Sequence, residues 1–186
     1  MSKHIDYEIN RELGECYLFM GELEKAAEYY RKAAVCGTGH ADPFFGLAAI
    51  AVQRGNLEEA GRQYQAALDL APGDKALTGL GLVRMEEGAA EEAFGCFGKA
   101  LDLNSDNILA LNSMLKLAYQ LTRVDEMIPR LEAALDGANN DAVRFSLAGC
   151  LSYLGNMDEA KSHLEILLDK NPGHTEAQEL YAHVAA

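Results

Sequence analysis

One stretch of nineteen residues is written nearly twice in this chain, one hundred positions apart. Residues 55–73 read GNLEEAGRQYQAALDLAPG, and residues 155–173 read GNMDEAKSHLEILLDKNPG. Self-similarity at a fixed interval predicts structural units that stack on one another. The interval of one hundred contains three shorter periods, because one anchor position recurs at spacings of 34, 33, 34 and 33 residues. The anchors are Ala26, Ala60, Ala93, Met127 and Ala160.

Further columns of apolar residues recur in phase with the anchors. A large apolar residue follows each anchor by four positions, at Tyr30, Tyr64, Phe97, Leu131 and Leu164. Three positions later stand Ala33, Ala67, Ala100, Ala134 and Leu167. Steps of four and three place these residues on one face of an α-helix. A second apolar set precedes the anchors: Leu13 with Gly14, Leu47 with Ala48, Leu80 with Gly81, Met114 with Leu115, and Leu147 with Ala148.

A turn signal separates the two apolar sets in every unit. These positions are Gly21, Gly55, Gly88, Thr122 and Gly155. Glycine is the residue that most readily ends a helix and lets the chain reverse. Each unit is therefore predicted to be a helix, a tight turn and a second helix.

Two local signals refine the start of the second helices. Asn56 with Glu59, and Asn156 with Glu159, have the spacing of a reciprocal capping box. Pro129 falls inside the expected second helix of the fourth unit, where proline removes a backbone hydrogen bond. We expect this helix to start late or to bend near Pro129.

A helical hairpin of about 34 residues with these columns resembles the tetratricopeptide repeat family. The resemblance rests on the Leu-Gly or Leu-Ala pair, the turn glycine, the anchor alanine, the aromatic residue, the next alanine and the terminal Pro72 and Pro172. It implies an all-α fold, a right-handed helical-hairpin solenoid forming a single domain over residues 1–186. The repeats lie near 7–40, 41–73, 74–107, 108–140 and 141–173, and a capping helix over 174–186 covers the last repeat.

The resemblance also implies a concave groove lined by the first helix of each repeat. The candidate ligand-binding residues are Phe19, Phe45, Ala49, Val52, Gln53, Met85, Glu86, Asn112, Lys116, Tyr119, Gln120, Phe145, Gly149, Ser152 and Tyr153. Aromatic walls with a few amides suit a peptide. The alternative, strongest for Phe45 and Phe145, is packing between neighbouring first helices.

Some members of the family hold the C-terminal carboxylate of a peptide with cations. The matching positions here are Arg11, Glu15, Gly46, Lys75 and Gly79. Only two of them are cationic and Glu15 would repel a carboxylate, so this binding mode is not expected.

The charge balance excludes several classes of partner. The chain has 29 acidic and 16 basic residues, a net charge of −13. Nucleic acids and anionic membranes both require a basic surface, so neither is an expected partner. The first residues, MSKHIDYEIN, lack the apolar core of a signal peptide. The four cysteines are scattered, and each lies among apolar residues in a helical pattern. Buried free thiols in a cytoplasmic protein are expected, with two disulfides as the alternative.

No motif for catalysis or metal binding stands out. None of the five histidines pairs with another at the i, i+4 spacing of a helical zinc site, and phosphate-binding and nucleophile motifs are missing from the sequence. The carboxylates are interpreted as a solvated helix face. We therefore expect no enzyme, no cofactor and no metal.

The sequence predicts a non-catalytic cytoplasmic adaptor that binds a protein or peptide segment in the groove. One alternative is a homo-oligomeric scaffold, with a homodimer through the end helices, where Tyr181 and Val184 could form the contact. Another is a secretion-type chaperone for an apolar client.

Overall fold

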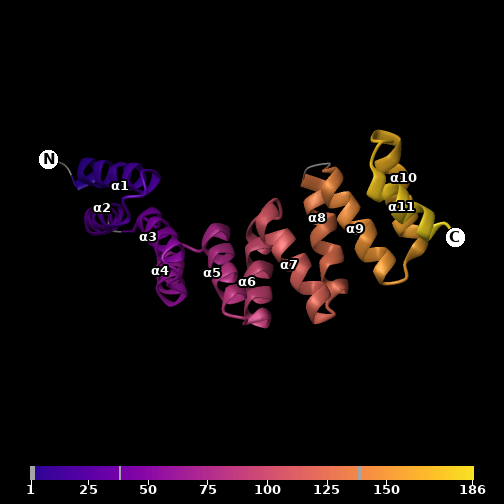
Figure 1. Ribbon diagram of the computed structural model, residues 1–186, viewed down its shortest axis with the longest axis horizontal. Coiled ribbons are helices and arrows are strands. Elements are labelled where there is room, and N and C mark those ends of the chain that lie inside the picture. Colours follow the sequence, from indigo (N-terminus) through magenta and orange to yellow (C-terminus); the bar gives the residue numbers. More distant parts are fainter. Residues whose placement is uncertain (1–2, 38, 138–139) are drawn as a thin grey trace. The chain divides into compact units, whose positions relative to one another are not determined.

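The computed structural model describes residues 3–37, 39–137 and 140–186, and the regular structure of these residues is entirely helical (Figure 1). This confirms the all-α prediction. The helices are α1 (Lys3–Phe19), α2 (Leu23–Cys36), α3 (Asp42–Gln53), α4 (Leu57–Leu70), α5 (Asp74–Glu86), α6 (Ala90–Leu103), α7 (Ile108–Leu121), the 3-10 helix η1 (Val124–Met127), α8 (Ile128–Gly137), α9 (Asp141–Tyr153), α10 (Met157–Lys170) and α11 (Thr175–Val184).

The helices group into two compact units, Met1–Ala100 and Leu101–Ala186. In unit 1, α1 packs on α2, α3 packs on α4, and each pair contacts the next helix along the chain. In unit 2, α8 packs on α9, α9 on α10, and α10 on α11. Contacts between helices that are neighbours in sequence are the arrangement that the repeated hairpin pattern predicts. None of the helices in the described residues is long and apolar enough to cross a membrane.

The predicted columns form the core of each unit. All five anchor residues are completely buried. The large residues four positions later are buried too, except Tyr64, which is half-buried. Small anchors permit close approach of the paired helices, and the large residues then fill the space between one pair and the next.

Aromatic rings of the second helices lie directly against glycines of the first helices. A Cβ atom built at Gly14 would lie 2.8 Å from the Tyr30 ring, and one built at Gly46 on the other side would overlap that ring. Tyr64 leaves no room for a Cβ at Gly79 either. Since Gly14 and Tyr30 share a repeat and Gly46 belongs to the next one, a single ring joins three helices.

The turn prediction is confirmed at every unit. Gly21, Gly55, Gly88 and Gly155 have positive φ angles of 77°, 68°, 80° and 85°. Thr122 takes the same left-handed conformation at φ 58°. A β-branched residue pays about 1–2 kcal/mol there, so the fourth repeat has the most strained of these turns.

The start of the second helix in the fourth repeat is late, as predicted. The chain passes through η1 first, and α8 begins only at Ile128. Pro129 thereby lies in the first turn of α8, where its missing N–H costs no helix hydrogen bond.

The capping predictions are only partly right. Asn56 Oδ1 accepts a hydrogen bond from the backbone N–H of Glu59 at 3.0 Å. The Glu59 carboxylate instead binds Arg62, so the bond is not reciprocal. Asn156 makes no side-chain capping bond, and the prediction for that helix is wrong.

Tyr7 fastens the long link between the first two repeats. Its hydroxyl donates a hydrogen bond to Asp42 at 3.1 Å, and its ring stacks on His40 with centroids 4.3 Å apart. Burial, with the Asp42 carboxylate second, raises the pKa of Tyr7 to about 12. At neutral pH the hydroxyl therefore stays protonated and can donate.

Helix α11 covers the apolar face of α10. Ala177 is buried together with Leu164 and Leu167, and Tyr181 and Val184 are half-buried against the same cluster. The four cysteines are free, as the sequence predicts, but the expected burial holds only for Cys150, because Cys36 and Cys96 are half-buried and Cys16 is exposed.

The contact between Tyr64 and Gly79 provides a test of the packing. Gly79→Ala should destabilise the protein by about 1–3 kcal/mol, because the methyl group must displace the ring. Gly95→Ala is the matched control, since a Cβ there meets nothing within 4 Å and alanine favours a helix by up to about 1 kcal/mol. Urea unfolding followed by circular dichroism measures both. Equal stability of the two variants would contradict the packing described here.

Candidate functional site

Two of the predicted groove residues form an exposed aromatic pair in unit 2. Tyr119 near the end of α7 and Tyr153 at the end of α9 have ring centroids 5.2 Å apart at an interplanar angle of 89°. Tyr119 is 40% exposed and Tyr153 is 55% exposed. The edge-to-face arrangement is a favourable one for aromatic rings, so each ring holds the other in position.

Residues of α9 pack against the hydroxyl end of the Tyr119 side chain. The Tyr119 hydroxyl lies 3.7 Å from Cys150 Sγ, and a Cβ built at Gly149 would lie 3.8 Å from the same oxygen. Burial of the hydroxyl, with Cys150 second, raises the pKa of Tyr119 well above its ordinary value. The ring therefore has a neutral, buried tip and an exposed edge.

Polar residues of the predicted groove lie on the same two helices as the aromatic pair. Asn112, Lys116 and Gln120 are exposed on α7, and Ser152 is half-buried on α9. Amides supply both donors and acceptors, which are the groups that an extended polypeptide backbone needs. We call Asn112, Lys116, Tyr119, Gln120, Ser152 and Tyr153 the tyrosine-pair surface.

Two predicted aromatic residues pack against neighbours. Phe145 is half-buried and lies 5.1 Å from the His174 ring, beside the buried cluster under α11. Phe45 is half-buried and lies 6.5 Å from the ring of Tyr64. Phe145 thus contacts the residue that precedes α11, and Phe45 contacts α4, the second helix of its own repeat. Much of each ring is therefore committed to packing within its unit.

The remaining predicted residues lie in unit 1. Phe19, the last residue of α1, is 94% exposed. Val52 and Gln53 are exposed at the end of α3, and Glu86 is exposed at the end of α5. Ala49 and Met85 are half-buried. Unit 1 thus presents one almost fully exposed ring, that of Phe19, and within the described residues no ring contact like that of Tyr119 supports it.

Four of the five positions that would bind a peptide carboxylate make internal contacts, and the fifth, Lys75, is exposed. Arg11 pairs with Glu8 at 3.0 Å and with Glu15 at 2.5 Å. Gly46 and Gly79 lie against tyrosine rings. The geometry therefore offers no reason to revise the expectation against carboxylate binding at these positions.

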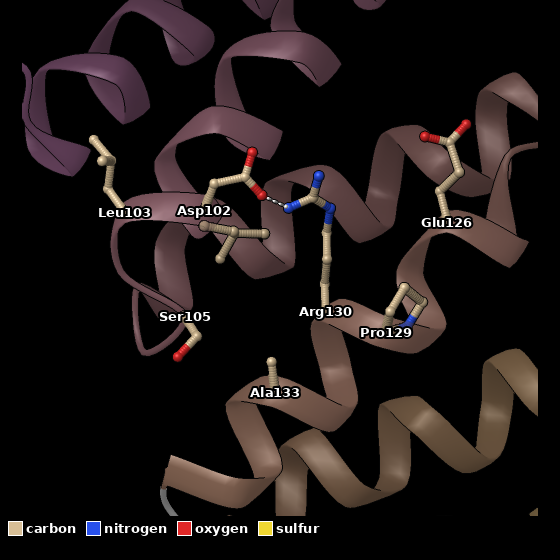
Figure 2. Close-up of a pocket in the computed structure, with 8 residues that line it drawn as sticks. Asp102, Leu103, Ser105, Glu126, Pro129, Arg130 and Ala133 are labelled. Carbon is tan, nitrogen blue, oxygen red and sulfur yellow. Dashed lines mark hydrogen bonds and ion pairs between the residues drawn. The ribbon is translucent and has the colours of Figure 1, made fainter.

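A cleft that the sequence did not predict lies between the end of α6 and the start of α8 (Figure 2). It encloses about 670 Å³ and is lined by Leu101, Asp102, Leu103, Ser105, Glu126, Pro129, Arg130 and Ala133. Arg130 reaches across it and binds Asp102 with an N–O distance of 2.7 Å. Glu126 is held by Arg123 at 2.6 Å. The charges of the cleft are therefore compensated inside the protein.

No cluster of three or more His, Cys, Asp or Glu side chains suited to a metal ion occurs in the residues that the structure describes.

Comparison with sequence families gives one consistent result. Models described as tetratricopeptide repeat match residues 8–34, 45–108 and 118–184. Between them, the three matches reach from the first helix to the last.

Two curated proteins share part of the sequence. BBSome complex member BBS4 from Bos taurus is 30% identical over 115 residues, which is 60% of this chain and 22% of that protein. Protein CTR9 homolog from Arabidopsis thaliana is 29% identical over 100 residues, which is 53% of this chain and 9% of that protein. The chain spans less than a quarter of the length of either relative.

Several solved structures share the fold. The chain is similar to Pseudomonas aeruginosa pilF, with a TM-score of 0.70, 19% identity and coverage of 100% of this chain and 85% of that one. It is also similar to YrrB, described as a TPR protein with an unusual peptide-binding site, with a TM-score of 0.65, 19% identity and coverage of 91% and 89%. At this identity the likeness concerns the fold alone.

The support of Tyr119 by α9 can be tested through Cys150. Burial raises the pKa of the Cys150 thiol, and the thiolate is the reactive form, so its alkylation should be slow. Tyr119→Ala should speed the reaction of Cys150 with N-ethylmaleimide about tenfold by uncovering the sulfur. Mass spectrometry of the digested protein gives the rate, and exposed Cys16 serves as the internal reference.

Tyr119→Phe keeps the ring and should leave Cys150 slow. If Cys150 in the unaltered protein reacts as fast as Cys16, the ring does not cover it.

Proposed function

Since the chain belongs to the tetratricopeptide repeat family, whose repeats mediate protein–protein interactions, we propose that it is a non-catalytic adaptor that binds a peptide or protein segment on its first-helix side. The single observation that carries this proposal is the exposed, mutually oriented pair of Tyr119 and Tyr153. The tyrosine-pair surface is the part of the predicted groove that we place at the centre of binding.

The energetics favour tyrosines as anchors for a partner. A tyrosine buries a large apolar area at low cost in conformational entropy, and tyrosines are enriched among the residues that dominate binding energy. Here the mutual contact and the support of Cys150 and Gly149 have already fixed the Tyr119 ring. A preformed surface loses less entropy when the partner binds.

The polar flank complements the rings. Gln120 and Asn112 can pair with the backbone of an extended segment while apolar side chains of that segment contact the rings. Among similar proteins, YrrB has a peptide-binding site in a fold of this kind, and BBS4 is a member of a protein complex. Both relationships support a role in assembly.

Replacement of the pair tests the proposal. The tagged protein is used to capture partners, which are identified by mass spectrometry, and a purified partner is then titrated by calorimetry. Tyr119→Ala with Tyr153→Ala should weaken binding at least about 100-fold, because two anchor residues each contribute about 2 kcal/mol or more. The double variant should remain folded, with a stability loss of about 1–2 kcal/mol from the lost ring contact and burial.

Ile166→Ala is the matched control, because Ile166 is an exposed apolar residue on α10, a second helix of the same unit. Its affinity should equal that of the unaltered protein. An undiminished affinity of the tyrosine variant would remove the pair from the binding site.

A second candidate function is self-association through α1. Ile5 and Ile9 lie four residues apart on one face of this helix, and both are about half exposed. If they form a contact between copies, sedimentation velocity should show a dimer at micromolar concentration and a monomer for Ile5→Glu. A monomer at all concentrations would leave only the adaptor function.

A further inference from the structure

The first repeat departs from the other four at two adjacent positions. Directly after the third apolar column, the later repeats carry leucine followed by aspartate: Leu68–Asp69, Leu101–Asp102, Leu135–Asp136 and Leu168–Asp169. The first repeat carries Ala34 and Val35 there. A small residue thus replaces a large one, and an apolar residue replaces a charged one.

This departure coincides with a cleft in unit 1. The cleft encloses about 450 Å³ between α2 and α4, and α3 forms its floor. Its lining includes Ala27, Ala34, Val35, Phe44, Leu47, Ile50 and Ala51, with polar residues at the rim. The side chain of Val35 is 78% exposed, although it is apolar and the equivalent residue of every other repeat is an aspartate.

The cleft of Figure 2 lies at the equivalent position of later repeats, between the second helices α6 and α8. Leu101 is buried there, and Asp102 binds Arg130 across the opening. The positions equivalent to Asp102 and Arg130 are Val35 and Gln63, both of which line the cleft of unit 1. Both places are open clefts, of about 670 Å³ in the later repeat and about 450 Å³ in the first, but the first lacks the leucine side chain and the ion pair that line the second.

Two arginines, Arg31 and Arg54, line the unit 1 cleft with a single carboxylate, although the chain has a net charge of −13. Arg54 is paired with Glu24 at 2.5 Å, whereas Arg31 has no such close partner in the part of the chain that the structure describes, although its charge helps to lower the pKa of Glu59. The only carboxylate in the lining, Glu59, is already bound by Arg62 at 2.6 Å and by Gln63 at 2.6 Å. Positions equivalent to Arg31 in the other repeats are Gln65, Gly98, Glu132 and Glu165.

We propose that the cleft between α2 and α4 binds a segment of a partner protein in which a leucine-like side chain stands next to a carboxylate. The apolar side chain occupies the space beside Ala34, where the other repeats carry a leucine. The carboxylate binds Arg31 at the rim. Residues of α2, α3 and α4 form this site, and none of its lining residues belongs to the tyrosine-pair surface.

The probe for this site is the peptide acetyl-Gly-Ala-Leu-Asp-Leu-Ala-Gly-amide. It is added to the full, nitrogen-15-labelled chain up to millimolar concentration, and amide shifts are followed by NMR, a measurement suited to weak binding. The shifts should concentrate around Ala34, Ile50 and Gln63. A peptide with lysine in place of the aspartate should bind at least about threefold more weakly, because it loses the exposed ion pair with Arg31.

Three variants test the assignment. Ala34→Leu restores the side chain of the other repeats and should weaken binding about tenfold or more by filling the space. Arg31→Gln, at an exposed position that cannot disturb the core, should weaken it about threefold. Tyr153→Ala should change nothing, so failure of the tyrosine-pair surface and failure of this cleft are separable.

Shifts that are absent at the cleft, or that persist unchanged in Ala34→Leu, would overturn the proposal. Equal binding of the lysine peptide would overturn the assignment of the carboxylate. Shifts at these amides on raising the protein concentration alone would make a second copy the occupant and would overturn the assignment to a partner protein.

Discussion

The fit of one large side chain against its neighbouring helices is the constraint on which each unit depends. Tyr30 fills the space between Gly14 and Gly46, neither of which has room for a methyl group beside it. Helices paired across small residues come close together, and a single ring can then contact its own hairpin and the following one. Later repeats carry Leu131 and Leu164 at the ring position. The contact thus varies in size while its place in the repeat is kept.

A looser contact with a glycine helps to position the candidate site, since a Cβ built at Gly149 would lie at an ordinary contact distance of 3.8 Å from the Tyr119 hydroxyl. Tyr119 lies over Gly149, but only its hydroxyl end is covered, and the ring edge stays in solvent beside Tyr153. The buried columns occupy one face of each helix, which leaves the opposite face of the first helices free to carry side chains that do not contribute to the core. Binding residues can therefore change in this family without altering how the hairpins stack.

Much of the fold was predictable because helical periodicity reports which face of a helix is buried. The anchors, the turns and the late start of α8 at Pro129 followed from that pattern and from backbone sterics. The capping bond of Asn156 did not form, because a spacing does not fix a side-chain rotamer. For Phe45 and Phe145 the groove and internal packing stay open as alternatives, since periodicity cannot tell which neighbouring ring covers a residue. The departure at Ala34 is visible in sequence, but the cleft requires the spacing of two helices.

The contact between Tyr30 and Gly46 depends on two consecutive repeats, because one supplies the ring and the next supplies the glycine that leaves room for it. Joining the first repeat directly to the fifth would set Tyr30 opposite Ser146, which stands at the place of Gly46. The hydroxymethyl group would enter the space of the ring. A rearrangement or deletion of whole repeats must therefore keep both residues of such a pair in neighbouring repeats. The surfaces that neighbouring repeats present to each other thus constrain the order of the repeats in this chain.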